Sequence, residues 1–317
     1  MWTSWTRRIA VRNRLAAALT VLALAACTPA PETAVEDPHA GSRPIAWNAL
    51  LERPRESADA RIFYGSGELE FGELWLPEGP GPHPVVAMIH GGCWLAAIPG
   101  TILQDYLAAD LRRRGIAVWN LEYARIGHAE GAYPGTFEDI AAGIDHLRVL
   151  SPEHGLDLDR LVFTGHSAGG HLALWAAARG VLAEDSPLHR ENPLLPDAVV
   201  TLAGINDLAD YRAHGPGRCG EPETVDNLLA GAGYDDTSPA AMLPVGVPQT
   251  VISGELDPIV PPVLGERYVL LAQAAGDEAV SITLPDAGHF ELIDPAAPAW
   301  AAILAEYERA LAPGTPD

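Results

Sequence analysis

Short apolar runs alternate with helical patterns along the chain from Ile45 onward. The apolar runs are rich in Val, Ile and Leu and are bounded by Gly or Pro, which is typical of strands buried on both faces. They predict strands at residues 85–90, 116–121, 161–164, 198–203, 249–254 and 280–284. Helical spacing predicts helices at residues 101–113, 136–150, 168–179 and 296–311. This alternation predicts an α/β fold with a mostly parallel central sheet and helices on both faces.

Two further segments complete the predicted domain, which spans residues 45–317. Residues 69–76 carry acidic side chains at alternate positions before the first buried strand, which predicts an antiparallel strand entering the sheet. Residues 205–247 form a long interval without a strand pattern and are rich in Gly, Pro and Asp. We interpret this interval as a small cap or substrate loop.

The first 44 residues differ from this domain in composition. Four arginines without acidic neighbours precede an apolar run at residues 15–26, which is shorter than the roughly 20 residues needed to span a bilayer. Residues 1–26 therefore predict an export signal peptide. The ending Leu-Ala-Ala-Cys at Cys27 resembles a bacterial lipobox, in which the cysteine is lipidated; the alternative is an ordinary signal followed by a chance cysteine. The proline-rich residues 27–44 predict a tether between Cys27 and the domain. Together, the signal and Cys27 predict an exported protein of the cell envelope that is attached to a membrane only through Cys27.

All 20 basic residues are Arg, against 42 acidic residues, for a formal charge of −22. The absence of Lys excludes Schiff-base chemistry, pyridoxal phosphate anchoring and the P-loop lysine. Removing the signal, with its four arginines, leaves 16 basic residues and a charge of −26. This charge repels phosphate backbones, and no stretch combines clustered Arg with aromatic residues. The sequence therefore predicts no nucleic-acid partner.

The strongest chemical signal is a serine between glycines. The sequence Gly165-His166-Ser167-Ala168-Gly169 follows a predicted strand and opens a predicted helix, which is the context that a nucleophile elbow requires. Side chains at the two glycine positions would clash in so sharp a turn. The alternative is a glycine-rich turn that carries an idle serine.

A serine hydroxyl needs a base to accept its proton, and His289 is the best-placed histidine. It follows the strand at residues 280–284, in a loop at the carboxyl edge of the sheet. By contrast, His166 and His171 lie on the wrong side of Ser167 or within its helix, and His90 shapes its own loop.

The base needs an orienting acid, and two aspartates compete for that role. Asp257 follows the strand at residues 249–254, and Asp207 follows the strand at 198–203. Asp257 is favoured because the usual chain order is Ser, Asp, His, with the acid in the loop before the strand of the histidine. Glu255 is a third candidate.

The loop His-Gly-Gly-Cys-Trp at residues 90–94 supplies a candidate oxyanion hole. Its glycines leave backbone N–H groups free to approach a developing negative charge, so the predicted donors are the N–H groups of Gly92, Cys93 and Ala168. The alternative for this loop is a plain glycine turn. Residues proposed as an apolar wall around a small acyl or aryl group, or else as core, are Trp94, Leu95 and Phe290.

Cofactor motifs and disulfide frameworks are not visible in the sequence. It contains no HExxH, no cysteine pair at zinc spacing and no GxGxxG after a strand, so neither a metal nor another cofactor is predicted. Only Cys93 and Cys219 remain in the domain. One disulfide is conceivable in an oxidising compartment, but burial must hold the fold together.

Taken together, these motifs resemble the α/β-hydrolase superfamily over about residues 45–311. The elbow, Asp257 and His289 match the order of its catalytic triad. The loop at residues 90–94 is similar to the HGGxW loop of kynurenine formamidases and of the bifunctional feruloyl and acetyl-xylan esterases. Residues 119–123 and 133–136 are similar to the same group.

The resemblance implies the α/β-hydrolase fold and a metal-independent serine hydrolase for small-molecule esters or N-formyl amides. The predicted export signal departs from the cytosolic setting of tryptophan catabolism. We therefore interpret the chain as a carboxylesterase for short-acyl or aryl esters. The alternatives are an arylformamidase, an exopeptidase or a non-catalytic lipoprotein binding module.

Overall fold

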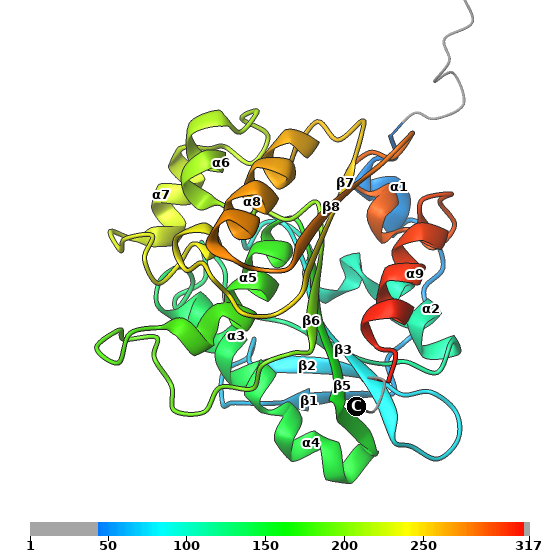
Figure 1. Cartoon of the computed structure of the whole chain (residues 1–317). Coiled ribbons are helices and arrows are strands. Elements are labelled where there is room, and N and C mark those ends of the chain that lie inside the picture. Colours follow the sequence, from blue (N-terminus) through cyan, green and yellow to red (C-terminus); the bar gives the residue numbers. More distant parts are fainter. Residues whose placement is uncertain (1–43, 314–317) are drawn as a thin grey trace, which may run out of the picture. The chain divides into compact units, whose positions relative to one another are not determined.

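The computed structural model describes residues 44–313 and is built around one sheet of eight strands (Figure 1). The strand order is β1-β2-β4-β3-β5-β6-β7-β8. β1 and β2 pair antiparallel, and the neighbours from β4 to β8 pair parallel. The strands are β1 Ala60–Phe63, β2 Phe71–Trp75, β3 His83–Ile89, β4 Ala117–Leu121, β5 Leu156–His166, β6 Ala198–Leu202, β7 Gln249–Gly254 and β8 Ala279–Leu284. The predicted α/β class and the antiparallel entry strand are confirmed.

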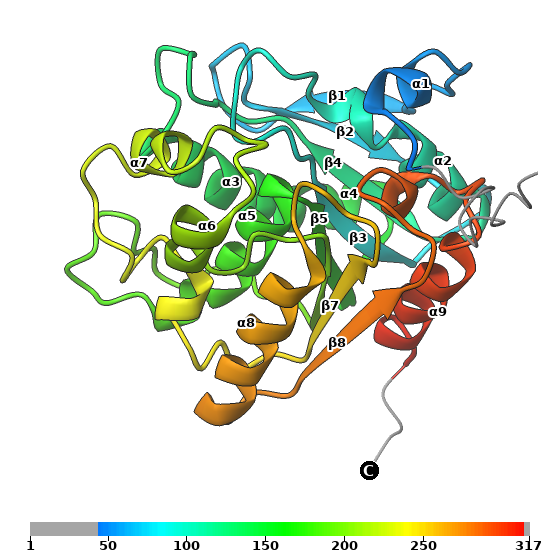
Figure 2. The same ribbon diagram turned by 90° about the horizontal axis from the view of Figure 1, so that it is seen from above.

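Helices cover both faces of the sheet (Figure 2). α1, α2 and α9 lie on one side, and α3, α5 and α8 lie on the other. The α-helices are α1 Trp47–Leu51, α2 Asp105–Arg113, α3 Gly135–Asp145, α4 Leu147–His154, α5 Ala168–Ala177, α6 Leu208–His214, α7 Glu223–Leu229, α8 Pro262–Ala275 and α9 Trp300–Ala310. The 3-10 turns are η1 Thr101–Leu103, η2 Ala178–Val181, η3 Pro239–Ala241 and η4 Glu291–Ile293. Every residue of α5 is buried, which accounts for its apolar sequence.

Some elements differ from those predicted. β8 was expected to be buried on both faces, but Val280 is 44% exposed, because β8 is an edge strand of the sheet. The predicted helix at residues 136–150 divides into α3 and α4. α8 was not predicted, although Pro262 at its first position is a common helix-start signal.

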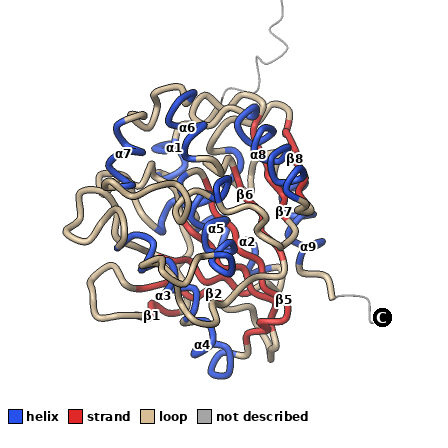
Figure 3. The backbone as a smooth tube through the Cα atoms, turned by 60° about the vertical axis from the view of Figure 1, so that its left-hand side comes forward, coloured by secondary structure: helices blue, strands red, loops and turns tan. Residues whose placement is uncertain are grey.

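The interval at residues 205–247 contains no strand and carries α6, α7 and η3, joined by loops (Figure 3). The predicted signal peptide at residues 1–26, Cys27 and all but the last residue of the tether at 27–44 lie outside the described residues. Within residues 44–313, no helix is both long and apolar enough to cross a bilayer.

Candidate active site

Loops at the carboxyl ends of four parallel strands bring the predicted catalytic residues to one edge of the sheet. Residues 90–94 follow β3, Ser167 follows β5, Asp257 follows β7 and His289 follows β8. Ser167 and His289 line one cavity of about 170 Å³. The strand order alone would place these loops near one another, and the lining of the cavity shows that those after β3, β5 and β8 share one space.

Ser167 occupies a strained turn between β5 and α5. Its φ of 57° and ψ of −122° lie in a region that side-chain-bearing residues rarely adopt. A Cβ atom at Gly165 would lie 2.1 Å from the Gly169 carbonyl oxygen, and one at Gly169 would lie 2.1 Å from that of Ile89. Both flanking positions therefore require glycine, as a nucleophile elbow does.

His289 and Asp257 form a buried pair. Nδ1 of His289 lies 2.6 Å from Oδ2 of Asp257, and the Asp257 side chain is fully buried. Oδ1 of Asp257 accepts backbone N–H groups from Ile259 at 2.7 Å and Val260 at 2.9 Å. With both oxygens engaged, the carboxylate has one orientation, and it leaves Nε2 of His289 available for chemistry.

The other two candidate acids have different positions. Asp207 is the N-cap residue of α6, and its Oδ1 accepts the N–H groups of Ala209 at 2.9 Å and Asp210 at 3.0 Å. Glu255 is exposed. The structure therefore brings only Asp257, among the three candidates, to His289.

His166 is a site residue that sequence reasoning set aside. Its Nε2–H donates to the backbone carbonyl of His289 at 2.9 Å, and the two rings lie 4.3 Å apart between centroids. Burial and the neighbouring His289 hold the pKa of His166 well below its ordinary value, so its ring is neutral. His166 therefore positions the loop that carries His289. Its place beside Ser167 was the signal available in the sequence.

The predicted oxyanion donors are free of internal partners. Within the described residues, the N–H groups of Gly92, Cys93 and Ala168 donate no hydrogen bond to another part of the chain. Gly92 and Cys93 line the cavity with Ser167, and Ala168 begins α5. The positive end of that helix dipole therefore points toward the serine.

A buried ion cluster supports this loop from behind. His90 Nε2 and Arg125 Nη2 lie 3.0 and 3.1 Å from Oε1 of Glu122, which also accepts the N–H of Tyr123. Burial would raise the pKa of Glu122, but His90 and Arg125 outweigh it and hold this pKa near 2. The hydroxyl of Tyr123 donates to the His90 carbonyl at 2.7 Å. Glu122 and Tyr123, from the segment that resembles the esterase group, thus hold the candidate oxyanion loop in place.

Cys93 and Cys219 form a disulfide across 126 residues. Their Cα atoms lie 5.4 Å apart. The bond joins the candidate oxyanion loop to the interval at residues 205–247, so that interval reaches the active-site cavity. Sequence reasoning treated the pairing as conceivable and could not establish it.

The cavity wall differs from the one predicted. Phe290 lines it as expected, but Trp94 and Leu95 do not. Trp94 is fully buried and donates its indole N–H to Nδ1 of His171 at 3.2 Å, so it joins the candidate oxyanion loop to α5. The expected apolar wall comes instead from residues far apart in the sequence, namely Trp47, Ile98, Leu103 and Ile259.

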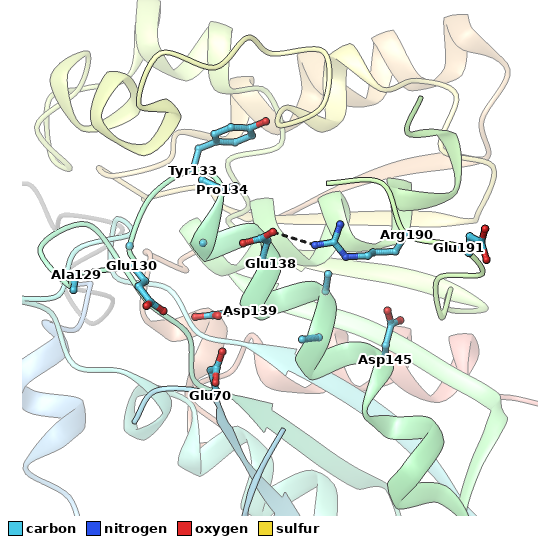
Figure 4. A pocket seen from close by; sticks show the side chains of 14 residues that line it. Glu70, Ala129, Glu130, Tyr133, Pro134, Glu138, Asp139, Asp145, Arg190 and Glu191 are labelled. Carbon is cyan, nitrogen blue, oxygen red and sulfur yellow. Dashed lines mark hydrogen bonds and ion pairs between the residues drawn. The ribbon is translucent and has the colours of Figure 1, made fainter. Parts of the chain in front are cut away.

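A larger cavity, of about 800 Å³, has an acidic lining and shares no residue with the first (Figure 4). Glu138 and Arg190 form an ion pair at its edge. Burial and the nearby Glu70, Glu130 and Glu138 raise the pKa of Asp139 to about 6, although its Oδ2 accepts the N–H of Ala124. Among residues 44–313, no His, Cys, Asp and Glu side chains gather in threes or more as a metal site would require.

Comparisons with known proteins find that this chain is similar to esterases. Residues 73–268 match the family model described as BD-FAE. Esterase LipC of Mycobacterium tuberculosis is 28% identical over 297 residues, which cover 87% of this chain and 70% of that protein. A probable isoprenylcysteine alpha-carbonyl methylesterase of Arabidopsis thaliana is 31% identical over 124 residues, 39% of this chain and 25% of that protein. The crystal structure of esterase B from Lactobacillus Rhamnosis has a TM-score of 0.73 at 20% identity, covering 83% of this chain and 89% of that one, a likeness of fold.

The sheet and its helices have the α/β-hydrolase fold. The BD-FAE model covers more than half of the chain, so the chain belongs to the BD-FAE family. It is a carboxylic ester hydrolase of the α/β-hydrolase class.

Proposed function

We propose that this chain is a serine carboxylesterase for short-acyl or aryl esters, with Ser167, His289 and Asp257 as its catalytic triad. The observation that carries the proposal is the joint placement of Ser167 and His289 in one small cavity, with Asp257 hydrogen-bonded to the far nitrogen of the histidine. Relatives named as esterases support the reaction class.

The proposed reaction proceeds through an acyl-enzyme. Nε2 of His289 takes the proton of Ser167 as Oγ attacks the carbonyl carbon, and Asp257 stabilises the imidazolium that forms. The N–H groups of Gly92, Cys93 and Ala168 stabilise the negative charge on the carbonyl oxygen. His289 then protonates the leaving alcohol. A water molecule, deprotonated by His289, releases the acid and restores Ser167.

The small cavity favours small acyl groups. Its volume of about 170 Å³ is below the range typical of sites for drug-sized ligands. Apart from the candidate catalytic groups, its lining is mostly apolar, with Ile98, Leu103, Ile259 and Phe290 among the residues that define it. A short acyl chain can fill such a space, whereas a long chain must project from it.

Nitrophenyl esters of increasing acyl length test the proposed preference. We expect kcat/KM to be greatest for the acetyl or butyryl ester and to fall by about 10-fold or more at the octanoyl ester, since a cavity rejects chains that it cannot enclose. N-formylkynurenine and an aminoacyl anilide belong in the same series. A maximum at long chains would overturn the short-acyl proposal. A formyl amide hydrolysed faster than every ester would assign the chain as an arylformamidase, and a preferred anilide would assign it as an exopeptidase.

We further propose that the protein is exported and attached to a membrane of the cell envelope through a lipid on Cys27. The Cys93–Cys219 disulfide favours an oxidising compartment, where such bonds persist. Full-length protein made in a bacterial host should partition into detergent, because two or more acyl chains anchor stably. Cys27→Ala should be soluble or remain unprocessed, and Cys93→Ala is the control that keeps Cys27. Mature wild-type protein found in the aqueous phase would contradict the anchor.

A further inference from the structure

One arginine that lines the candidate active-site cavity has no ionic partner among the described residues. Of the fifteen arginines within residues 44–313, fourteen form an ion pair with a carboxylate. The exception is Arg218, which forms neither an ion pair nor a side-chain hydrogen bond with any other described residue. In a chain with 42 acidic residues and no lysine, a guanidinium without a carboxylate is unusual.

Arg218 lies in the candidate active-site cavity, where a substrate would meet its charge. It lines the same cavity as Ser167 and His289, where no Asp or Glu is part of the wall. The remaining wall is formed by Gly92 and Cys93 of the glycine loop, by His166 and by apolar side chains. Among residues 44–313, Arg218 is therefore the only permanently charged side chain in the wall of this cavity, and no carboxylate of these residues pairs with it.

The backbone that carries Arg218 is held on both sides. The Glu221 carboxylate accepts the N–H groups of Gly217 at 2.6 Å and Cys219 at 3.1 Å. Cys219 is also joined to Cys93 of the candidate oxyanion loop, and its carbonyl accepts the Thr224 hydroxyl at 2.6 Å. Because the backbone is fixed, only the side chain of Arg218 must be ordered when it binds a ligand, and this lowers the entropy cost.

We propose that Arg218 is a specificity residue that binds a carboxylate on the substrate, so that the enzyme prefers esters carrying one negative charge. This inference rests on the proposed esterase function. A guanidinium matches the two oxygens of a carboxylate in bidentate geometry. A single positive charge within a strongly acidic protein favours a monoanion, because further negative charges on the substrate would meet only repulsion. The carboxylate belongs either to the acyl part or to the alcohol part of the ester.

Two matched pairs of esters distinguish those sources. In the first, the carboxylate is on the leaving group: 4-acetoxybenzoate is compared with its neutral methyl ester. In the second, it is on the acyl group: monophenyl glutarate is compared with methyl phenyl glutarate, with phenol release as the readout. Each pair differs chiefly in the negative charge. Wild-type enzyme should favour the anionic member of at least one pair.

The variant Arg218→Gln should lower kcat/KM for that anionic ester by about 10-fold and leave its neutral partner within about twofold. Arg218→Lys should keep part of the preference, because it retains the charge but loses the bidentate geometry. Arg212→Gln is the matched control: it removes the same charge from the same interval, at a residue paired with Asp226. Its charge preference should equal that of the wild type.

An equal loss on anionic and neutral esters, or no loss on either, would overturn the role of Arg218. Charge-selective loss in the first pair would assign the carboxylate to the alcohol part, and in the second pair to the acyl part. Wild-type protein that hydrolyses none of the four esters would instead contradict the proposed esterase function. The two failures are therefore distinguishable.

Discussion

Replacing Ser167 with Ala is expected to lower kcat for 4-nitrophenyl butyrate by at least about 10³-fold, and His289→Ala should have a similar effect. In the proposed mechanism, Ser167 supplies the oxygen that forms the acyl-enzyme. His289 lines the same cavity, and because its Nδ1 faces Asp257, its Nε2 serves as the base. Because the two residues act in the same step, the double variant should be little slower than either single variant.

The measurement is steady-state kinetics on purified protein, with labelling by a fluorophosphonate probe beside it. Wild-type protein should be labelled, and Ser167→Ala should not. The matched control is Ser281→Ala, which alters an exposed serine on the edge strand β8 and should leave both readouts unchanged. A Ser167→Ala variant that keeps a tenth of the activity would contradict the assignment, and unlabelled wild-type protein would favour the non-catalytic binding module.

Asp257→Asn should lower kcat by about 10²- to 10⁴-fold. The substitution places an amide N–H where Oδ2 now faces Nδ1 of His289 at 2.6 Å. The histidine would then have to present Nδ1 as an acceptor and carry its proton on Nε2, which removes the lone pair that accepts the serine proton. The amide oxygen can still accept the N–H groups of Ile259 and Val260, so the loop should keep its structure.

Asp207→Asn is the matched control for this prediction. Asn is as good an N-cap residue as Asp, so α6 should remain capped and kcat should stay within about twofold of the wild-type value. Comparing kcat and thermal unfolding for both variants separates a chemical effect from a structural one. If the two aspartates exchange these outcomes, the orienting acid is Asp207 and the position of Asp257 beside His289 has no catalytic role.

Features encoded by local pattern could be read directly from the chain. The buried strands follow from continuous apolar runs, and the turn at Ser167 follows from glycines whose close backbone contacts exclude a Cβ atom. The order of motifs along the chain then indicated which residues belong to one site. The structure places Asp257 beside His289 and brings Ser167 and His289 to the same cavity.

Features that depend on long-range packing were harder to predict from the sequence. α8 carries exposed apolar side chains such as Leu270 and Leu271, so its pattern lacks a clear polar face and was not predicted. The exposure of β8 follows from its place at the edge of the sheet. Trp94 was taken as a possible pocket wall because it is adjacent to the glycine loop, but its side chain turns into the core against His171.

The sequence by itself determined the α/β class, the elbow at Ser167 and the candidates for base and acid, because each depends on neighbouring residues and on strand order. Only the tertiary structure decided that Cys93 pairs with Cys219, that Trp47 and Ile259 line the cavity, and that Arg218 has no ionic partner within residues 44–313. Those properties depend on distances between residues far apart in the chain. A local pattern cannot specify such distances, because many folded paths of the intervening chain are compatible with it.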